Sequence, residues 1–278
     1  MNHPKKWRET CDPFALPFRS FRLLAVLGYP HAGNDVFHVE GIFRGKRLRA
    51  YLKVERQKGA AVGNEAAILR QIRHPAIPEV LEAGERYCLT REKPGERLST
   101  LLGDNVGLPS MAYLREYGRT LAWIHRQRPD APPVADRKFF HRPSKELLNQ
   151  LGLSHLEGFF QEEPKAEQIC FCHGDFHYAN LLWQGGHLSA ILDLELAGYG
   201  DRDFDIAWAL LPRSGQRFLK TPEEQRLFLE GYEELGTCSH AAIAFHMAKA
   251  AVYFLNICQD DPIYCTYLRK WLDKPWEV

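Results

Sequence analysis

The first part of the chain carries the period-two pattern of β-strands. Apolar and polar residues alternate, although imperfectly, through residues 21–54, and turn-forming residues that include Gly33 and Gly45 divide this stretch into three runs. Alternation bounded by turns is typical of strands that pair antiparallel. We therefore expect residues 21–54 to fold as a small antiparallel sheet.

A helical repeat replaces the strand pattern at residues 62–72, where the apolar residues recur on one face. Asn64 stands before the apolar run, and it is the expected N-cap of this helix. Two further short strands are expected at about 78–82 and 86–91. The first third of the chain is therefore expected to be a sheet with one helix.

A Pro94-Gly95 pair then breaks the pattern. We place a domain boundary at this break, with an N-terminal lobe of residues 1–93 and a C-terminal lobe of residues 94–278. The pattern beyond the break is mainly helical. Helices are expected at 111–128, at 144–153 and from Phe204 onward, and short strands return only at 168–194, where Gln184-Gly185-Gly186 is the expected hairpin turn.

Composition and charge exclude several classes of protein. The chain has 278 residues, of which 45% are hydrophobic, so it can bury a sizeable core. Its net charge of +1 gives no basic surplus, which argues against a nucleic-acid or membrane-surface binder. The most apolar long segment, 241–257, is shorter than a membrane span and contains His246 and Lys249, so we expect a buried helix there.

The cysteines and the N-terminus indicate a cytoplasmic protein. The seven cysteines are odd in number, irregularly spaced and without a C-x-x-C pair, which fits a reducing compartment. No long apolar region follows the basic N-terminal residues, so we do not expect a secretory signal.

The segment "CFCHGDFHYANLLW" concentrates polar groups in an apolar run. It could be a transition-metal site, a phosphoryl-transfer loop or a polar turn. Asn180 precedes one expected strand and Asp193 follows the next, so antiparallel pairing brings both to one end of a hairpin. An amide oxygen and a carboxylate there suit Mg²⁺. Asp175 lies just upstream, where it could accept a proton from a hydroxyl, as phosphoryl transfer requires.

Together, "HGDFHYAN" and "ILDLELAGYGDRDFDIAWAL" resemble the catalytic loop and metal-binding segment of the aminoglycoside phosphotransferase/choline kinase family. The resemblance extends over most of the chain and includes "AGNDVFHV", "AYLKV", "NEAAILRQI", "GRTLAWIH" and "FLEGYEELG" in the same order. It implies an α+β, two-lobed protein-kinase-like fold, with a small N-terminal antiparallel-sheet lobe and a larger, mainly helical C-terminal lobe. It also implies an ATP-dependent phosphotransferase that uses Mg²⁺.

The resemblance assigns roles to particular residues. Asp175 is similar to the catalytic base, Asn180 and Asp193 match the magnesium ligands, Lys53 matches the lysine on the α/β-phosphates, and Glu65 matches the residue that orients this lysine.

Other assignments concern the nucleotide and the loop supports. Gly33 and Asn34 fall in the expected phosphate loop, where glycines are sparse. Thr90 to Lys93, which includes Arg91 and Glu92, would be the hinge that receives the adenine. Asp205 resembles the aspartate that braces the catalytic loop. Tyr178-Ala179 departs from the Pro-Gly that the family often has before the asparagine.

Some residues near the motif have plainer interpretations. His173 is expected to hold the loop, whereas His177 stays open between a phosphate contact and a structural role. We expect Asp201 and Asp203 to be surface turn residues. We expect Glu195 to hydrogen-bond locally, although assistance to the metal is the alternative, and we expect Trp123 and His125 to pack in the core.

Two other functions compete with a kinase. A hydrolase or oxygenase could bind zinc or iron through His173, Asp175 and His177, but residues spaced this way share a face only on a strand, and Asn180 and Asp193 would be unexplained. A pseudokinase that only binds a nucleotide or a partner is the other, and the intact motif residues argue against it.

The acceptor is expected to be a small molecule with a hydroxyl group. Only eleven residues separate Asp193 from Asp205, and the A-P-E anchor of protein kinases is absent. An aminoglycoside, a choline-like alcohol, another amino-alcohol or a sugar all stay open, and the sequence does not indicate an oligomeric state. A cationic acceptor would require a cluster facing Asp175 that draws on carboxylates and aromatics of the helical region: Glu230, Glu233, Glu234, Asp260, Asp261, Trp208, Tyr232, Tyr253 and Tyr264.

Overall fold

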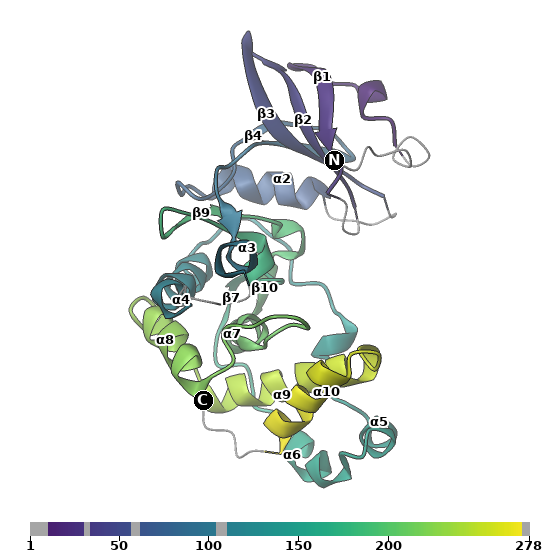
Figure 1. Cartoon of the computed structure of the whole chain (residues 1–278), viewed down its shortest axis with the longest axis vertical. Coiled ribbons are helices and arrows are strands. Elements are labelled where there is room, and N and C mark those ends of the chain that lie inside the picture. Colours follow the sequence, from purple (N-terminus) through teal and green to yellow (C-terminus); the bar gives the residue numbers. More distant parts are fainter. Residues whose placement is uncertain (1–10, 31–33, 57–61, 104–109, 274–278) are drawn as a thin grey trace.

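An antiparallel sheet of five strands forms the N-terminal part of the computed structural model, which describes residues 11–30, 34–56, 62–103 and 110–273 (Figure 1). The strand order is β1-β2-β3-β5-β4. In β2 every second residue is buried, which explains the alternation in the sequence. The strands are β1 (Phe21–Gly28), β2 (Asp35–Phe43), β3 (Lys46–Val54), β4 (Val80–Ala83) and β5 (Tyr87–Arg91).

One face of this sheet carries a core of its own. Phe37, Leu52 and Leu89 are fully buried there, one from each of β2, β3 and β5. Helix α2 (Val62–Gln71) lies between the sheet and the rest of the molecule (Figure 1), and its apolar residues join the larger core of the C-terminal part. The expectation for Asn64 is wrong, because the helix already includes Val62 and Asn64 is its third residue.

The C-terminal part is mainly helical, as expected. A three-stranded sheet of order β6-β8-β9 and a two-stranded sheet of β10 and β7 lie among the helices. The helices are α3 (Leu98–Leu102), α4 (Met111–His125), α5 (Lys145–Gln150), α6 (Glu157–Gln161), α7 (Arg202–Leu210), α8 (Pro222–Glu233), α9 (His240–Ile257) and α10 (Pro262–Leu272).

The short strands of this part surround the polar motif. Gly185 and Gly186 both have positive φ and join β8 to β9, which confirms the expected hairpin turn. Strand β10 was not predicted from the sequence, and it pairs with β7 over four residues. The bounds of these strands are β6 (Glu96–Arg97), β7 (Ile169–Cys172), β8 (Leu181–Gln184), β9 (His187–Ile191) and β10 (Gly198–Asp201).

The fold therefore has the α+β architecture expected from the sequence. Helix α9 is mostly buried, as predicted for the apolar segment 241–257. None of the described helices is both long enough and apolar enough to cross a bilayer. The domain boundary at residue 93 stays a prediction; β6, which follows it directly, pairs with β8 of the C-terminal part.

Candidate active site

The loop that carries the polar motif is held from behind by a buried aspartate. Asp205 of α7 accepts hydrogen bonds from the backbone nitrogens of His173 (2.9 Å) and Gly174 (3.1 Å). Gly174 has φ +78°, and a Cβ at this position would lie 2.2 Å from the carbonyl oxygen of Leu196, so the loop needs glycine here. Asp205 thus contacts the loop in the way that the resemblance implied.

His125 supports Asp205 in turn, which core packing alone did not anticipate. The histidine is buried, with Nε2 3.1 Å from Asp205 Oδ2 and Nδ1 2.7 Å from the Tyr232 hydroxyl. Burial would lower the pKa of His125, but the hydrogen bond to Asp205 outweighs it and raises the pKa to about 9. The imidazolium and Asp205 therefore form a buried ion pair beneath the loop.

Asp175 is the carboxylate that the loop presents. Its Oδ1 accepts a 2.8 Å hydrogen bond from Trp208 Nε1, and its Oδ2 lies 3.6 Å from His177 Nε2. Burial would raise the pKa of Asp175, but the contacts with His177 and Trp208 outweigh it and hold the pKa well below its ordinary value. The group is therefore a carboxylate at neutral pH and can accept a proton or a hydrogen bond.

His173, Asp175 and His177 do not converge on one point. His173 is fully buried, its Nε2 bonds to the carbonyl of Leu192 (3.0 Å), and its Nδ1 accepts the backbone N–H of Asp175. His177 Nδ1 accepts from the backbone nitrogen of Ala179 (3.3 Å), at the start of the 3₁₀ turn η4 (Tyr178–Asn180). These contacts give His173 a structural role and leave the transition-metal reading without a common ligand position.

Two oxygen-bearing side chains flank Asp175. Asn180 Nδ2 donates to the backbone carbonyl of Asp175 (2.9 Å), which leaves the amide oxygen as the atom that could bind a cation. The backbone N–H of Leu192 donates to the carbonyl of Asn180 (2.8 Å), so Asp193 follows immediately beside it. The hairpin therefore brings Asn180 and Asp193 to one end, and their hard oxygen donors fit Mg²⁺.

Lys53 meets three carboxylates in the space between the sheet and this hairpin. Its Nζ lies 2.7 Å from Glu65 Oε2, 2.6 Å from Asp193 Oδ1 and 3.5 Å from Glu195 Oε2. Burial would lower the pKa of Lys53, but the charges of Glu65 and Asp193 outweigh it and raise the pKa. Glu65 also accepts the backbone N–H of Leu194 (3.1 Å), so helix α2 and the segment after Asp193 are joined through the same cluster.

Asn34 and Glu195 make a contact across the two parts of the chain. Asn34 Nδ2 donates to Glu195 Oε2 (2.7 Å), and Asn34 Oδ1 accepts the backbone N–H of Arg56 (3.2 Å). The expectation that Glu195 bonds locally is therefore wrong, because its partner lies 161 residues away in sequence. Gly33, which was assigned to the same loop, lies outside the described residues.

The expected hinge residues make contacts of their own. Arg91 donates from Nε to Glu79 (2.6 Å) and from its backbone nitrogen to the Glu79 carbonyl (2.9 Å). The Glu92 carboxylate lies 2.9 Å from His38 Nε2, and its backbone N–H donates to the Arg49 carbonyl. Both backbone N–H groups are occupied within the protein, so neither is free for a purine in this arrangement.

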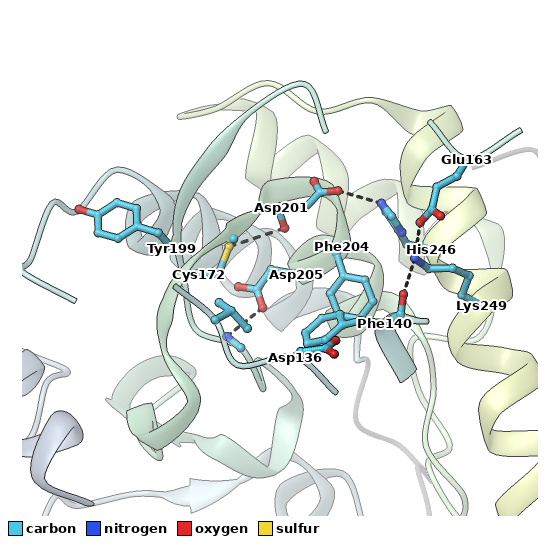
Figure 2. A pocket seen from close by; sticks show the side chains of 13 residues that line it. Asp136, Phe140, Glu163, Cys172, Tyr199, Asp201, Phe204, Asp205, His246 and Lys249 are labelled. Atoms are coloured by element: carbon cyan, nitrogen blue, oxygen red, sulfur yellow. Dashed lines mark hydrogen bonds and ion pairs between the residues drawn. The ribbon is translucent and has the colours of Figure 1, made fainter. Parts of the chain in front are cut away.

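Asp201 and Asp203 are not surface turn residues as expected. Asp203 is fully buried, where Arg202 donates to both of its carboxylate oxygens (2.9 and 2.8 Å). Asp201 caps α7 through the backbone N–H of Asp203 and pairs with His246 at 3.0 Å (Figure 2). Burial is possible because each carboxylate has found a cation or an N–H group, and sequence periodicity does not show such pairing.

A cavity of about 310 Å³ lies behind the catalytic loop (Figure 2). Gly174 and Phe204 line it, and Lys249 from α9 closes one side, where its ammonium bonds to Glu163 (2.6 Å) and to the Phe140 carbonyl (2.8 Å). Asp175 is not among the lining residues, although Gly174 is its neighbour in sequence. The cavity therefore adjoins the motif without containing its carboxylate.

The carboxylates and tyrosine considered for a cationic acceptor lie elsewhere. Glu230 pairs with Arg115 and Arg226, and Glu234 pairs with Arg119, on the surface where α8 packs against α4. Tyr232 is buried against His125. Among the described aromatic residues considered for this cluster, Trp208 contacts Asp175 directly.

The comparisons with known proteins agree on one family. Residues 30–245 match the sequence profile of the phosphotransferase enzyme family. An aminoglycoside 3'-phosphotransferase from Niallia circulans is 38% identical over 72 residues, which is 26% of this chain; the match spans about a quarter (27%) of that relative's length.

Solved structures share the fold. A thermostable mutant of aminoglycoside phosphotransferase APH(4)-Ia, in ternary complex with ADP and hygromycin B, superposes with a TM-score of 0.58 at 16% identity, covering 91% of this chain and 92% of the other. A macrolide 2'-phosphotransferase from Brachybacterium faecium gives 0.55 at 15% identity, with 93% and 94% covered. Identities this low establish the common fold.

Proposed function

Because this chain belongs to the phosphotransferase enzyme family, we propose that it transfers the γ-phosphate of ATP, with Mg²⁺, to a hydroxyl of a small molecule. Residues 1–93 would supply the nucleotide lobe and residues 94–278 the catalytic and acceptor lobe.

One observation carries this proposal: Lys53 Nζ lies 2.6 Å from Asp193 Oδ1 at the end of the hairpin where Asn180 and Asp175 lie. Phosphoryl transfer needs a cation on the phosphates, oxygen ligands for a divalent metal and a carboxylate near the acceptor. All three come together here from strands far apart in sequence. The Lys53–Glu65 pair, at 2.7 Å, adds the support that positions the lysine.

The residues divide the work as follows. Asn180 and Asp193 would hold the metal, which when bound neutralises charge on the phosphates. Lys53 would contact the α- and β-phosphates, and Asp175 would accept the proton of the acceptor hydroxyl as its oxygen bonds to the γ-phosphorus and ADP leaves. A carboxylate with a lowered pKa is a weak base, so Asp175 would orient the hydroxyl first and take the proton late in the step.

The size of the acceptor follows from the segment after Asp193. Strand β10 and helix α7 begin at once, at Gly198 and Arg202, and leave no extended platform for a peptide. The structural neighbours whose names give a substrate act on antibiotics, among them a macrolide phosphotransferase and an amicoumacin kinase. A small hydroxylated acceptor is the consistent choice for this chain.

The alternatives have less support. A hydrolase using His173, Asp175 and His177 would need ligand atoms that converge, and His173 is committed to the Leu192 carbonyl. A pseudokinase would be expected to lack part of the lysine–metal–base set, and every member is in place here.

An ATP-turnover screen tests the proposal. The purified protein would be incubated with Mg·ATP and a panel of aminoglycosides, amino-alcohols, sugars and hydroxy acids, with release of ADP as the readout. We expect turnover that depends on both Mg²⁺ and one class of alcohol. Phosphorylation of generic protein substrates alone would overturn the small-molecule acceptor.

A further inference from the structure

An arginine without a partner lies on the acceptor side of Asp175. The Arg137 guanidinium makes no hydrogen bond or ion pair with any residue that the structure describes, although it is half-buried. It lies over the ring of Phe139 at 5.5 Å. Its electrostatic neighbours are the carboxylates of the site, Asp175 first, then Glu195 and Asp193. A half-buried arginine with five unused donors is suited to an oxyanion.

An aromatic face holds this arginine close to the base. Phe139 stacks on Trp208, with ring centroids 4.3 Å apart, and Trp208 is the residue that hydrogen-bonds Asp175. Tyr253 of α9 meets Phe139 edge-on at 5.6 Å. The chain of contacts from Arg137 through Phe139 and Trp208 to Asp175 therefore forms one wall beside the carboxylate. A ring or apolar body could pack on this wall while its hydroxyl reaches Asp175.

A second arginine adds positive charge to the same wall. Arg213 lies 4.1 Å from the Trp208 ring and 5.2 Å from the Phe254 ring, and it donates to the carbonyls of Leu211 and Trp208. Its hydrogen bonds fix the position of Trp208, so it has a structural use that Arg137 lacks. Its charge nevertheless faces Asp175 and disfavours a polycation there.

No uncompensated acid offsets these arginines among the described residues near the cavity. Asp201 pairs with His246 and Glu163 pairs with Lys249. Asp136, the neighbour of Arg137, pairs with His141 at 2.8 Å. The acids on α8 are already paired with arginines of α4. The described part of the site thus offers an amine no free carboxylate apart from those that serve the metal and the proton.

We propose that the acceptor is an alcohol that carries an oxyanion, a carboxylate or a phosphate group, and that Arg137 binds this group while the body of the acceptor packs on Phe139 and Trp208. The proposal rests on the proposed function, since it names the acceptor class of that same site. It replaces the cationic alcohol that the sequence suggested. The competing use of Arg137 is a contact with the phosphoryl group in transfer, which would not depend on the acceptor.

Three matched probes test the charge preference without requiring turnover: 4-(hydroxymethyl)benzoate, its neutral amide and 4-(hydroxymethyl)benzylamine. Binding of each would be measured by calorimetry in the presence of Mg·AMP-PNP, for the wild type and for Arg137→Gln. The control is Lys138→Gln, which removes the same charge from the adjacent, exposed residue. We expect the acid to bind about tenfold or more tighter than the amide, because hydrogen bonds between charged groups are strong, and we expect Arg137→Gln alone to abolish this preference.

Equal binding of the three probes, or tightest binding of the amine, would overturn the proposal. The alternative role is read from turnover: if Arg137→Gln lowers kcat equally for acidic and neutral acceptors and for hydrolysis of ATP by water, Arg137 serves the transferred phosphoryl group and the proposal fails. Absence of any Mg·ATP turnover, with the acid preference and its loss in Arg137→Gln intact, would instead count against the proposed function while supporting the oxyanion site.

Discussion

The indole nitrogen of Trp208 donates a 2.8 Å hydrogen bond to Asp175 Oδ1, and this contact ties helix α7 to the catalytic loop. The same ring stacks on Phe139 and carries Arg213 on its face. Trp208 therefore connects the base of the proposed reaction to the wall against which the acceptor would pack.

Trp208→Phe keeps an aromatic ring but removes the N–H. The lost hydrogen bond to a charged group is worth about 1.5–3 kcal/mol, so we expect kcat to fall by roughly tenfold or more. The pKa of Asp175 should also rise, because one of the contacts that lowers it is gone, and the acidic limb of the kcat profile should move to higher pH. Trp123→Phe, at a ring beside His74, is the control that should leave both unchanged.

Lys53→Met removes the cation that three carboxylates share. Removing one partner of a buried ion pair typically costs about 3–5 kcal/mol, and Lys53 is only 16% exposed. We expect the free energy of unfolding to fall by an amount of this order, and Glu65→Gln added to Lys53→Met should recover part of it, whereas Mg·ATP binding should stay lost in both. Chemical denaturation and calorimetry measure the two effects. Lys46→Met, at an exposed position of the same strand, should change neither, and full nucleotide affinity in Lys53→Met would refute the phosphate role.

Asp193 and Glu195 are two residues apart but should behave differently. Asp193→Asn removes a metal-ligand charge, so we expect the metal-dependent part of ATP binding to be lost. Glu195→Gln keeps an oxygen that can accept from Asn34, so most of that affinity should remain. Titration of ATP with and without Mg²⁺ separates the two variants, and an equal loss in both would mean that Glu195 also serves the metal.

The stability of the N-terminal sheet should depend on pH through Glu82. This buried carboxylate accepts hydrogen bonds from the backbone nitrogens of Arg19 (2.7 Å) and Ser20 (2.8 Å) and from the Tyr87 hydroxyl (2.8 Å). Burial would raise its pKa, but these hydrogen bonds outweigh it and lower the pKa from 4.5 to about 2. The stabilisation is therefore present above pH 4.5 and is lost as pH falls toward 2.

Glu82→Gln should accordingly be less stable than the wild type at pH 7, by roughly 1–3 kcal/mol, and the difference should shrink as pH falls from 4.5 toward 2. Thermal unfolding across this range gives the answer. A stability difference that is constant with pH would show that Glu82 contributes nothing through its charge.

Much of the site could be predicted because its signals are local. The spacing from Asn180 through a two-glycine turn to Asp193 defines a hairpin, and period-two alternation places Lys53 on a strand. These features depend on neighbours close in sequence, and the structure places Lys53, Glu65, Asn180 and Asp193 together around Asp175.

The features that the sequence did not indicate all depend on partners distant in the chain. Asn34 meets Glu195, Trp208 meets Asp175, and His125 meets Asp205 only once the fold has formed. Arg137 lies in the irregular segment after a proline-rich loop, where no periodicity indicates which way a side chain points. The acidic run around Asp203 resembles a surface turn because charge is a poor guide to burial when a cation such as Arg202 is adjacent.

The most direct test of the account is phosphoryl transfer by Asp175→Asn, measured with γ-labelled ATP and the best acceptor from the screen, together with Mg·ATP affinity by calorimetry. The variant keeps the shape of the side chain and a possible contact with Trp208 but cannot take the acceptor proton. Loss of a general base typically costs about 10²–10⁴ in rate, so we expect kcat to fall by this factor while nucleotide affinity stays close to that of the wild type. Full turnover by a folded Asp175→Asn protein would contradict the central claim that this carboxylate activates the acceptor.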